Sequence, residues 1–283
     1  MTTSTLLRAA TALTIAAVFT ACGDSAAISE PTDPGVSASV TTATTLDVAT
    51  LSGDAAKEDV EMFQVNRGAF GILQAIDFER FARWDSCPYD ATAKRFICVD
   101  RVRGPFTATR SYAYADQAGV AQTAYNAATT ASGNFKWSLS GNVTKEKWSG
   151  SISRNRDITI SNLLGTNTTV TVNGTGAAER QRTTFLRDSA GPNGLTRTYD
   201  MESSLAIANV VTPAIRLPDA WPASGTITRN YKVTRIDASN GTIVTTRNSV
   251  VTFNGTSTAS LVVNGREFSL DLATGKVTPK TTT

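Results

Sequence analysis

The chain has 283 residues, long enough for one large domain or two small ones, and 41% of them are hydrophobic, so a substantial core is expected. The formal net charge of +3 is too small to favour nucleic acid as a partner. Histidine is absent, which excludes Ser-His-Asp and Cys-His catalysis, histidine-ligated zinc and a histidine pH switch.

Residues 1–21 have the pattern of a lipoprotein signal peptide. Arg8 precedes an apolar run, Ala9–Phe19, which is shorter than the roughly 20 apolar residues that a membrane-spanning helix needs. The tetrapeptide that follows, Phe19-Thr20-Ala21-Cys22, resembles the lipobox of bacterial lipoproteins, with phenylalanine where leucine is usual. The alternative is an ordinary signal peptide followed by a chance cysteine.

The lipobox resemblance implies that the thiol of Cys22 is lipidated and that this residue becomes the mature N-terminus. Several acyl chains on one residue anchor a protein stably without a spanning helix. We therefore expect an exported protein that contacts the membrane through the lipid on Cys22, at the periplasmic face or the cell surface.

If Cys22 is lipidated, Cys87 and Cys98 remain as a pair in an oxidising compartment, where a disulfide is expected. Asp90–Lys94 would form the turn of a hairpin between them, and a loop of this size stabilises the fold by roughly 3 kcal/mol in the chain-entropy model. The alternative, a reactive dithiol, lacks the usual C-x-x-C spacing.

The N-terminal part of the mature chain is poor in large apolar residues. Residues 22–54 are rich in Ala, Ser, Thr, Pro and Gly, which predicts a flexible tether. One short helix is predicted over Asp54–Gln64, with Asp54 as its N-cap. Ala69–Trp84 fits a strand or a helix, and the strand is favoured. Residues 55–283 are expected to form a single β domain.

Alternating strand patterns dominate from Phe106 onward. In FKWSLSGNV, Phe135, Trp137 and Leu139 share one face and polar residues the other; in TITRNYKV, Arg229 lies opposite Asn230 and Lys232. Asn-Gly or related turn signals separate the runs, at Asn173-Gly174, Pro192-Asn193-Gly194, Asn240-Gly241, Asn254-Gly255 and Asn264-Gly265. Short connections predict an all-β fold, a single antiparallel meander of about 11–13 strands that curls into a barrel-like or sandwich sheet.

Three groups of side chains are candidates for chemistry or binding. Carboxylates near the cysteine pair are candidates for the paired acids of glycoside hydrolysis, but interleaved Arg and Lys favour a solvated hairpin; they are Asp77, Glu79, Asp85, Asp90 and Asp100. Arginines on neighbouring predicted strands form a candidate site for an anionic envelope ligand such as lipopolysaccharide, a phospholipid headgroup or an acidic glycan, with protection of sheet edges as the alternative; they are Arg154, Arg156, Arg180, Arg182, Arg187 and Arg197. Arg180 and Arg182 are the preferred contacts.

Four tryptophans could line a binding groove, although packing in the core is the more common role. Trp137 and Trp148 are expected to be core partners on adjacent strands, and Trp84 has no distinguishing context. Trp221, in the proline-bounded segment LPDAWPASG, is the preferred contact for a ligand or partner.

A second resemblance covers most of residues 60–273. The segments RSYAYADQAG, AQTAYNAATTAS, WPASGTITR and VVTFNGTSTASLVVNGREFSLDL are similar to a group of uncharacterised β-rich lipoproteins from environmental bacteria. The group implies no activity, ligand or catalytic residue, so it adds nothing to the functional expectation.

No catalytic motif accompanies these features: Rossmann, P-loop, G-x-S-x-G and EF-hand patterns are absent, and no cofactor or metal is expected. We expect a lipid-anchored, non-enzymatic envelope protein that binds an apolar or amphipathic ligand, or a protein partner, on its curved sheet. The first alternative is a structural or adhesive surface lipoprotein without a ligand pocket. The second is a carboxylate-based glycan hydrolase.

Overall fold

The computed structural model describes residues 45–46, 48–50, 52–53, 55–57, 87–144, 148–185, 196–214, 220–237 and 241–280. Described residues between 45 and 57 are helical. The strands are β1 (Tyr89–Asp90), β2 (Arg95–Ile97), β3 (Arg101–Arg103), β4 (Phe106–Ala115), β5 (Ala121–Gln122), β6 (Ser132–Thr144), β7 (Trp148–Ser161), β8 (Thr169–Phe185), β9 (Thr196–Pro213), β10 (Ser224–Asp237), β11 (Gly241–Thr252), β12 (Thr258–Val263), β13 (Arg266–Asp271) and β14 (Val277–Pro279). The predicted signal peptide, Cys22 and the ambiguous segment Ala69–Trp84 lie outside the described residues.

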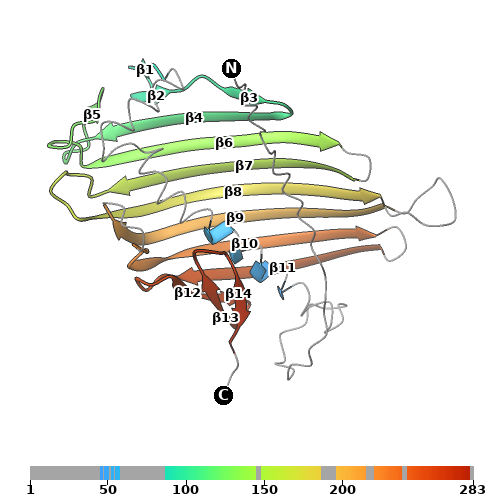
Figure 1. Ribbon diagram of the computed structural model, residues 1–283. Coiled ribbons are helices and arrows are strands. Elements are labelled where there is room, and N and C mark those ends of the chain that lie inside the picture. Colours follow the sequence, from blue (N-terminus) through green and yellow to red (C-terminus); the bar gives the residue numbers. More distant parts are fainter. Residues whose placement is uncertain are drawn as a thin grey trace, which may run out of the picture.

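All described strands belong to one antiparallel sheet (Figure 1). Along the path from β1 to β14 each strand pairs with the next, and the short strands β3 and β5 pair with β4 beside that path. Among the described strands, β14 pairs with β13 alone and β1 with β2 alone, so the sheet is curved but not closed into a barrel. The predicted all-β meander is confirmed.

One predicted turn is wrong. Asn173-Gly174 lies inside β8, at a shift in register against β9, and the Asn173 Oδ1 accepts a hydrogen bond of 2.8 Å from the backbone N–H of Asn209. A Cβ on Gly174 would approach the backbone oxygen of Asp157 to 2.6 Å. The glycine here permits close strand packing at a bulge rather than a hairpin turn.

Asn264-Gly265 does form the predicted hairpin turn, between β12 and β13. Both residues have positive φ angles, 47° and 85°, as a tight turn between antiparallel strands requires. Asn240 and the Pro192-Asn193-Gly194 signal lie outside the described residues.

The helical turns between residues 45 and 57 pack against one face of the sheet, which we call the inward face; the other is the outward face. Ser52 Oγ lies 3.1 Å from Tyr231 Oη of β10 and 3.0 Å from Ser249 Oγ of β11. In Figure 1 these turns lie in front of β9–β11, so that view looks onto the inward face. The described helical residues begin at residue 45, within the stretch that was predicted to be a flexible tether. Val48 and Ala49 of this stretch are buried.

The C-terminal strands pack against the same helical turns. A Cβ on Gly53 would lie 2.5 Å from the Gly275 oxygen and 2.6 Å from a Val277 methyl group, so only glycine allows this approach. Leu270, whose side chain would lie 3.3 Å from the same Cβ, is fully buried, as are Leu261 and Phe268 of β12 and β13. The core therefore continues from the inward face of the long strands into β12–β14.

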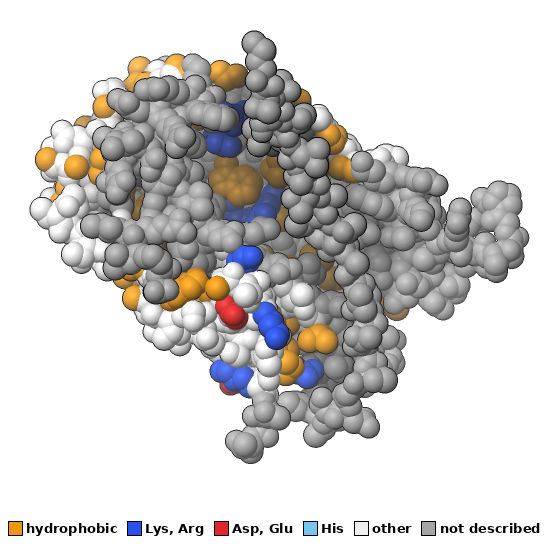
Figure 2. All heavy atoms as spheres, viewed as in Figure 1, with side chains coloured by type: hydrophobic (Ala, Val, Ile, Leu, Met, Phe, Trp, Pro, Cys, Tyr) orange, Lys and Arg blue, Asp and Glu red, His pale blue; other side chains and the backbone are white. Residues whose placement is uncertain are grey.

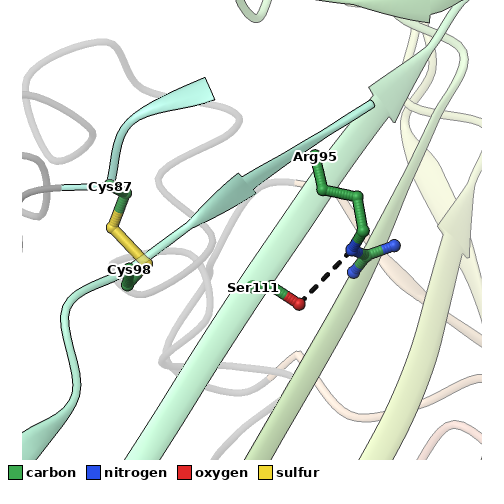
Figure 3. Close-up of a disulfide and its surroundings, with 4 residues drawn as sticks. All are labelled: Cys87, Arg95, Cys98 and Ser111. Atoms are coloured by element: carbon green, nitrogen blue, oxygen red, sulfur yellow. Dashed lines mark hydrogen bonds between the residues drawn. A yellow bond between two sulfur atoms is a disulfide. The ribbon is translucent and has the colours of Figure 1, made fainter. Parts of the chain in front are cut away.

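The N-terminal edge of the sheet carries the predicted disulfide. Cys87 and Cys98 lie with their sulfur atoms 2.17 Å apart, at the base of the β1–β2 hairpin (Figure 3). Asp90 Oδ1 accepts hydrogen bonds from the backbone N–H groups of Thr92 and Ala93, which closes the expected turn.

Candidate binding face

The strand register arranges the inward face in rows that run across the sheet. One row is entirely apolar or small and contains Tyr112, Phe135, Ile158, Gly174, Ile207, Ile227 and Val251. The next row contains Arg110, Trp137, Arg156, Gly176, Leu205, Arg229 and Ser249. The third contains Ala108, Leu139, Arg154, Ala178, Ser203, Tyr231 and Arg247.

A fourth row is largely apolar but is interrupted on β8 by the exposed Arg180. It contains Gly141, Ile152, Arg180, Met201, Val233 and Thr245. We call its half-buried members Ile152, Met201 and Val233, together with Leu139 of the third row, the apolar strip. The arginines of the second and third rows, Arg110, Arg154, Arg156, Arg229 and Arg247, form what we call the arginine band. The band therefore lies between a buried apolar row and the half-buried apolar strip.

The two faces differ in the charged residues that they carry. Among residues of β4–β11 whose side chains the structure describes, the inward face has no Asp, Glu or Lys; its charged residues are the arginine band and Arg180. The outward face of the same strands has acids and lysines but no arginine; they are Lys136, Asp157, Glu179, Asp200, Glu202 and Lys232. In Figure 2, Lys and Arg side chains lie beside hydrophobic ones on the inward face.

Three members of the band are deeply buried. Arg156, Arg229 and Arg247 are only 5%, 3% and 2% exposed. The Arg156 guanidinium donates to the Asn155 carbonyl at 3.0 Å, and that of Arg247 donates to the Thr246 carbonyl at 2.8 Å. Withdrawing a guanidinium from water costs several kcal/mol before its contacts offset it, so this concentration of arginine is a costly feature for a purely structural sheet.

Three arginines of the band lie next to Trp137 on the neighbouring strands. The guanidinium carbon of Arg154 lies 5.6 Å from its ring centroid and that of Arg156 lies 5.9 Å away. Arg110 is its register partner on β4. Cation–π contacts of this kind hold a guanidinium against the face of an indole.

The N-terminal end of the inward face is aromatic. Phe96 stacks on Tyr112 with centroids 4.7 Å apart, and Tyr114 contacts Tyr125 at 5.8 Å. Burial raises the pKa of Tyr112 to about 12, and burial with repulsion from neighbouring tyrosines raises the pKa of Tyr114. These phenols stay protonated at neutral pH, so they serve packing rather than acid–base chemistry.

The outward face neutralises its charges locally. Asp157 bonds to Lys136 Nζ at 2.8 Å and accepts from Asn134 Nδ2 at 2.7 Å. Partial burial alone would raise the pKa of Asp157, but hydrogen bonds from Lys136 and Asn134 outweigh burial and hold that pKa below its usual range. Arg95 extends this network, since it donates to Asn134 Oδ1 at 2.8 Å and to Ser111 Oγ at 3.3 Å (Figure 3).

Two polar hollows lie mainly over outward-face side chains. One, of about 580 Å³, lies over β4–β8 and includes Ser140, Asn142, Ser151 and Ser153. The other, of about 690 Å³, lies over β8–β12 and includes Glu179, Glu202, Asn230, Lys232 and Asn248. Glu179 and Glu202 are register partners, but both are exposed and Lys232 bonds to Glu202 at 3.1 Å.

The predicted arginine ladder shares one face. Arg154, Arg156 and Arg180 occupy inward positions, and the backbone register places Arg182 and Arg197 on the same side. Arg187 lies outside the described residues. The sequence-based selection missed Arg110, Arg229 and Arg247. Each lies two or four residues from an apolar neighbour on the same strand (Tyr112, Ile227 and Val251), and this even spacing was a usable signal.

The other predicted site residues are not brought together. Trp221 is half-buried and packs against the core, and it lies outside the strands that carry the arginine band. Asp90 closes the hairpin turn and Asp100 is exposed, while Asp77, Glu79 and Asp85 lie outside the described residues. Trp84 also lies outside them.

Within the described part of the chain, no group of three or more His, Cys, Asp or Glu side chains is placed to hold a metal ion. None of the helical turns described is long and apolar enough to cross a membrane. No family model, no curated protein and no solved structure matches the chain.

Proposed function

We propose that this protein is an exported, lipid-anchored envelope protein that binds an amphipathic ligand on the inward face of its sheet, without catalysing a reaction. The single observation that carries the proposal is the composition of the inward face. It combines an arginine band with an adjacent apolar strip, and its described side chains on β4–β11 include no acid.

The apolar strip supports a ligand with an apolar part. Leu139, Ile152, Met201 and Val233 are each half-buried, so a part of every side chain is accessible. Their strands β6, β7, β9 and β10 span four strand spacings, about 19 Å across the sheet. An extended hydrocarbon chain bound along this strip would lose its contact with water at a gain of about 25 cal/mol per Å² of buried apolar surface.

The proposed lipid anchor also favours an amphipathic ligand. The lipobox at Phe19-Thr20-Ala21-Cys22 would hold the domain close to a membrane, where amphipathic molecules are concentrated. The glycan hydrolase receives less support, because Glu179 and Glu202 are exposed on the outward face and Glu202 is paired with Lys232. A catalytic acid usually lies in a cleft that perturbs it.

The test uses variants of two adjacent residues on β6 that point to opposite faces. The full chain is titrated calorimetrically with two chain-matched amphiphiles, dodecyl phosphate and dodecyl maltoside, each below its micelle concentration. Leu139→Asp on the inward face should weaken binding at least tenfold, since it places a carboxylate in the apolar strip. Ser140→Asp on the outward face is the matched control and should leave the affinity unchanged.

Two results would contradict the proposal. One is the absence of saturable binding of either amphiphile to the unaltered chain. The other is an equal loss of affinity in the Leu139→Asp and Ser140→Asp variants, because that would place the ligand elsewhere or nowhere specific.

A further inference from the structure

Part of strand β11 forms an open edge of the sheet. On one side β11 pairs with β10 along its whole length, from Gly241 to Thr252, but on the other side β12 pairs only with Ser249–Thr252. In Figure 1, β12–β14 accordingly lie beside one half of β11. Within the described part of the chain, no strand pairs with Thr242–Thr246 on that side, and we call this segment the β11 edge.

The hydrogen bonds of Asn248 show which backbone groups point toward this edge. Asn248 donates its N–H to Asn264 Oδ1 at 2.7 Å, and its carbonyl accepts from the Asn264 N–H at 2.9 Å. Alternate residues of an antiparallel strand direct their N–H and C=O groups to the same side. Thr242, Val244 and Thr246 therefore direct theirs away from β10, along the β11 edge.

The β11 edge lacks the usual protection against pairing with another strand. Proteins commonly shield such edges with Lys or Pro, with bulges or with very short strands. At the ends of the sheet path, β1 has two residues, and β14 has three, with Pro279 as its last residue and Lys280 after it. Thr242–Thr246 has no charged residue and no proline, and it pairs with β10 without a shift in register. It also exposes apolar surface, because Val244 is 48% exposed and Ile236, beside it on β10, is 46% exposed.

We infer that the β11 edge pairs with the β11 edge of a second copy of the chain, antiparallel and with a two-fold axis at Val244. In that register Val244 lies opposite Val244 of the second copy, and Thr242 lies opposite Thr246. All the backbone groups directed along the edge then face one another, which allows about six hydrogen bonds between the copies. The Thr246 carbonyl already accepts from Arg247 at 2.8 Å, and its second lone pair serves the new bond.

Neighbouring registers of the same kind allow fewer bonds. An axis at Thr245 would place Thr242 opposite Asn248, whose N–H and C=O groups are already bonded to Asn264. An axis at Ile243 would place Thr246 beyond the start of β11 at Gly241. The alignment at Val244 is therefore the one that uses the whole open segment.

The side chains brought together by this register are complementary. On the outward face Thr lies opposite Thr and Val opposite Val, which are suitable cross-strand pairs of β-branched residues. On the inward face Ile243 lies opposite Thr245 of the second copy. Arg247 lies opposite Gly241 of the second copy, and the backbone register continues that row to Asp237. The row thus combines charges of opposite sign, and no like charges face each other.

The size of the contact predicts a weak dimer. The pairing uses far fewer residues than the roughly 20–30 on each side of a standard interface, so we expect reversible association that depends on concentration. Anchoring of both copies in one membrane through Cys22, if it occurs as proposed, would raise their effective concentration and favour the dimer.

The pairing goes beyond the proposed function, because it concerns the edge of the sheet and needs no ligand. The fourth row of the inward face reaches β11 at Thr245, where it is the register partner of Val233. In the dimer this row continues to Ile243 of the second copy. The inward faces of two copies would then form one continuous surface.

The first experiment measures the association of the full chain by sedimentation equilibrium over a range of concentrations. The parent chain should show a reversible monomer–dimer equilibrium. Val244→Lys places a charge at the centre of the pairing and should weaken the dimer roughly tenfold or more. Thr234→Lys is the matched control, because Thr234 is the register partner of Val244 on the inner strand β10, and it should leave the dissociation constant unchanged.

The second experiment tests the register by disulfide cross-linking, with Cys22→Ser in every chain. Val244→Cys should form a disulfide between two copies under mild oxidation. Thr242→Cys and Thr246→Cys should cross-link with each other when the two variants are mixed. Neither should cross-link with itself, since the two-fold pairing separates identical residues by about 13 Å along the strands, beyond the reach of a disulfide.

Three results would overturn the inference. They are a parent chain that stays monomeric at every concentration, equal weakening by Val244→Lys and Thr234→Lys, and cross-linking of Thr242→Cys with itself instead of with Thr246→Cys. None of these results concerns amphiphile binding, which the Leu139→Asp and Ser140→Asp variants test separately. Failure of the dimer and failure of the proposed function are therefore distinguishable.

Discussion

The two faces of the central strands are built from the same sheet but handle charge differently. On the outward face, Lys136 pairs with Asp157 at 2.8 Å and Lys232 with Glu202 at 3.1 Å, and each of these side chains is about half exposed. On the inward face, arginines stand among apolar residues and three of them are almost fully buried. Exposed pairs of the first kind contribute little to stability, whereas the burial of an arginine side chain carries a desolvation cost that its contacts must offset.

The inward face is the better candidate for a functional surface. The outward face resembles an ordinary wet sheet surface, in which Ser, Thr and Asn side chains bond to one another, as Asn248 does to Asn230 at 2.8 Å. The inward face departs from the rule that a buried sheet face is apolar. Departures of that kind mark a site when they cluster, as they do around Trp137.

The largest expected effect contrasts two neighbours on β10. Ile227→Ala removes a fully buried inward side chain and should lower the free energy of unfolding by about 2–5 kcal/mol. Thr228→Ala, on the outward face, should change it by less than about 0.5 kcal/mol. Urea unfolding followed by circular dichroism measures both, and equal effects would contradict the assignment of the faces.

The next effect concerns the N-terminal edge of the sheet, where β1 and β2 are short and the disulfide adds a covalent link. Replacing Cys87 and Cys98 together with Ser should cost about 3 kcal/mol, because the unfolded chain gains conformational freedom. Thermal unfolding of the oxidised protein measures this loss. Cys22→Ser in the same protein is the control and should leave the melting temperature unchanged; a double variant as stable as the parent would refute a stabilising role for the disulfide.

The smallest effect is on the outward face and depends on pH. The folded pKa of Asp157 lies below its unfolded value of about 3.9, so its contribution is fully present above that value and is lost as the pH falls through the folded pKa. Asp157→Asn should therefore cost less than about 1 kcal/mol at pH 7, since the pair is half exposed, and the difference from the parent should disappear in acid. Urea midpoints at pH 7 and pH 2.5 measure it, and a difference that grows on acidification would contradict the assignment.

Much of the fold was predictable because it depends on local patterns. The alternation of Phe135, Trp137 and Leu139 places them on one face of a strand, and Asn264-Gly265 specifies a tight turn. The Asp90 turn also follows from nearby residues, whereas the disulfide pairing was predicted by setting Cys22 aside as the lipidated cysteine. Such features need no knowledge of which strands are neighbours.

The rest depends on long-range register, which local patterns do not encode. Arg156 and Arg229 fall in one row only because β7, β8, β9 and β10 pair in a particular alignment, with bulges near Gly174 and Gly225. Gly225 has a φ of 101°, and a Cβ added to it would clash with the backbone of Val210 on β9. No rule for turns predicts a glycine at this position, because the close approach comes from the neighbouring strand. The arginine band is therefore a property of the assembled sheet rather than of any one strand.

The most direct test of a functional difference between the faces is photolabelling with a dodecyl phosphate that carries a diazirine at the end of its chain. Peptide mapping by mass spectrometry would then identify the labelled residues. We predict labelling of the apolar strip, at Leu139, Ile152, Met201 or Val233, and its suppression by excess unlabelled dodecyl phosphate. Labelling that falls instead on the outward residues of the same strands, such as Ser140, Ser153 or Asp200, would contradict the proposed binding face.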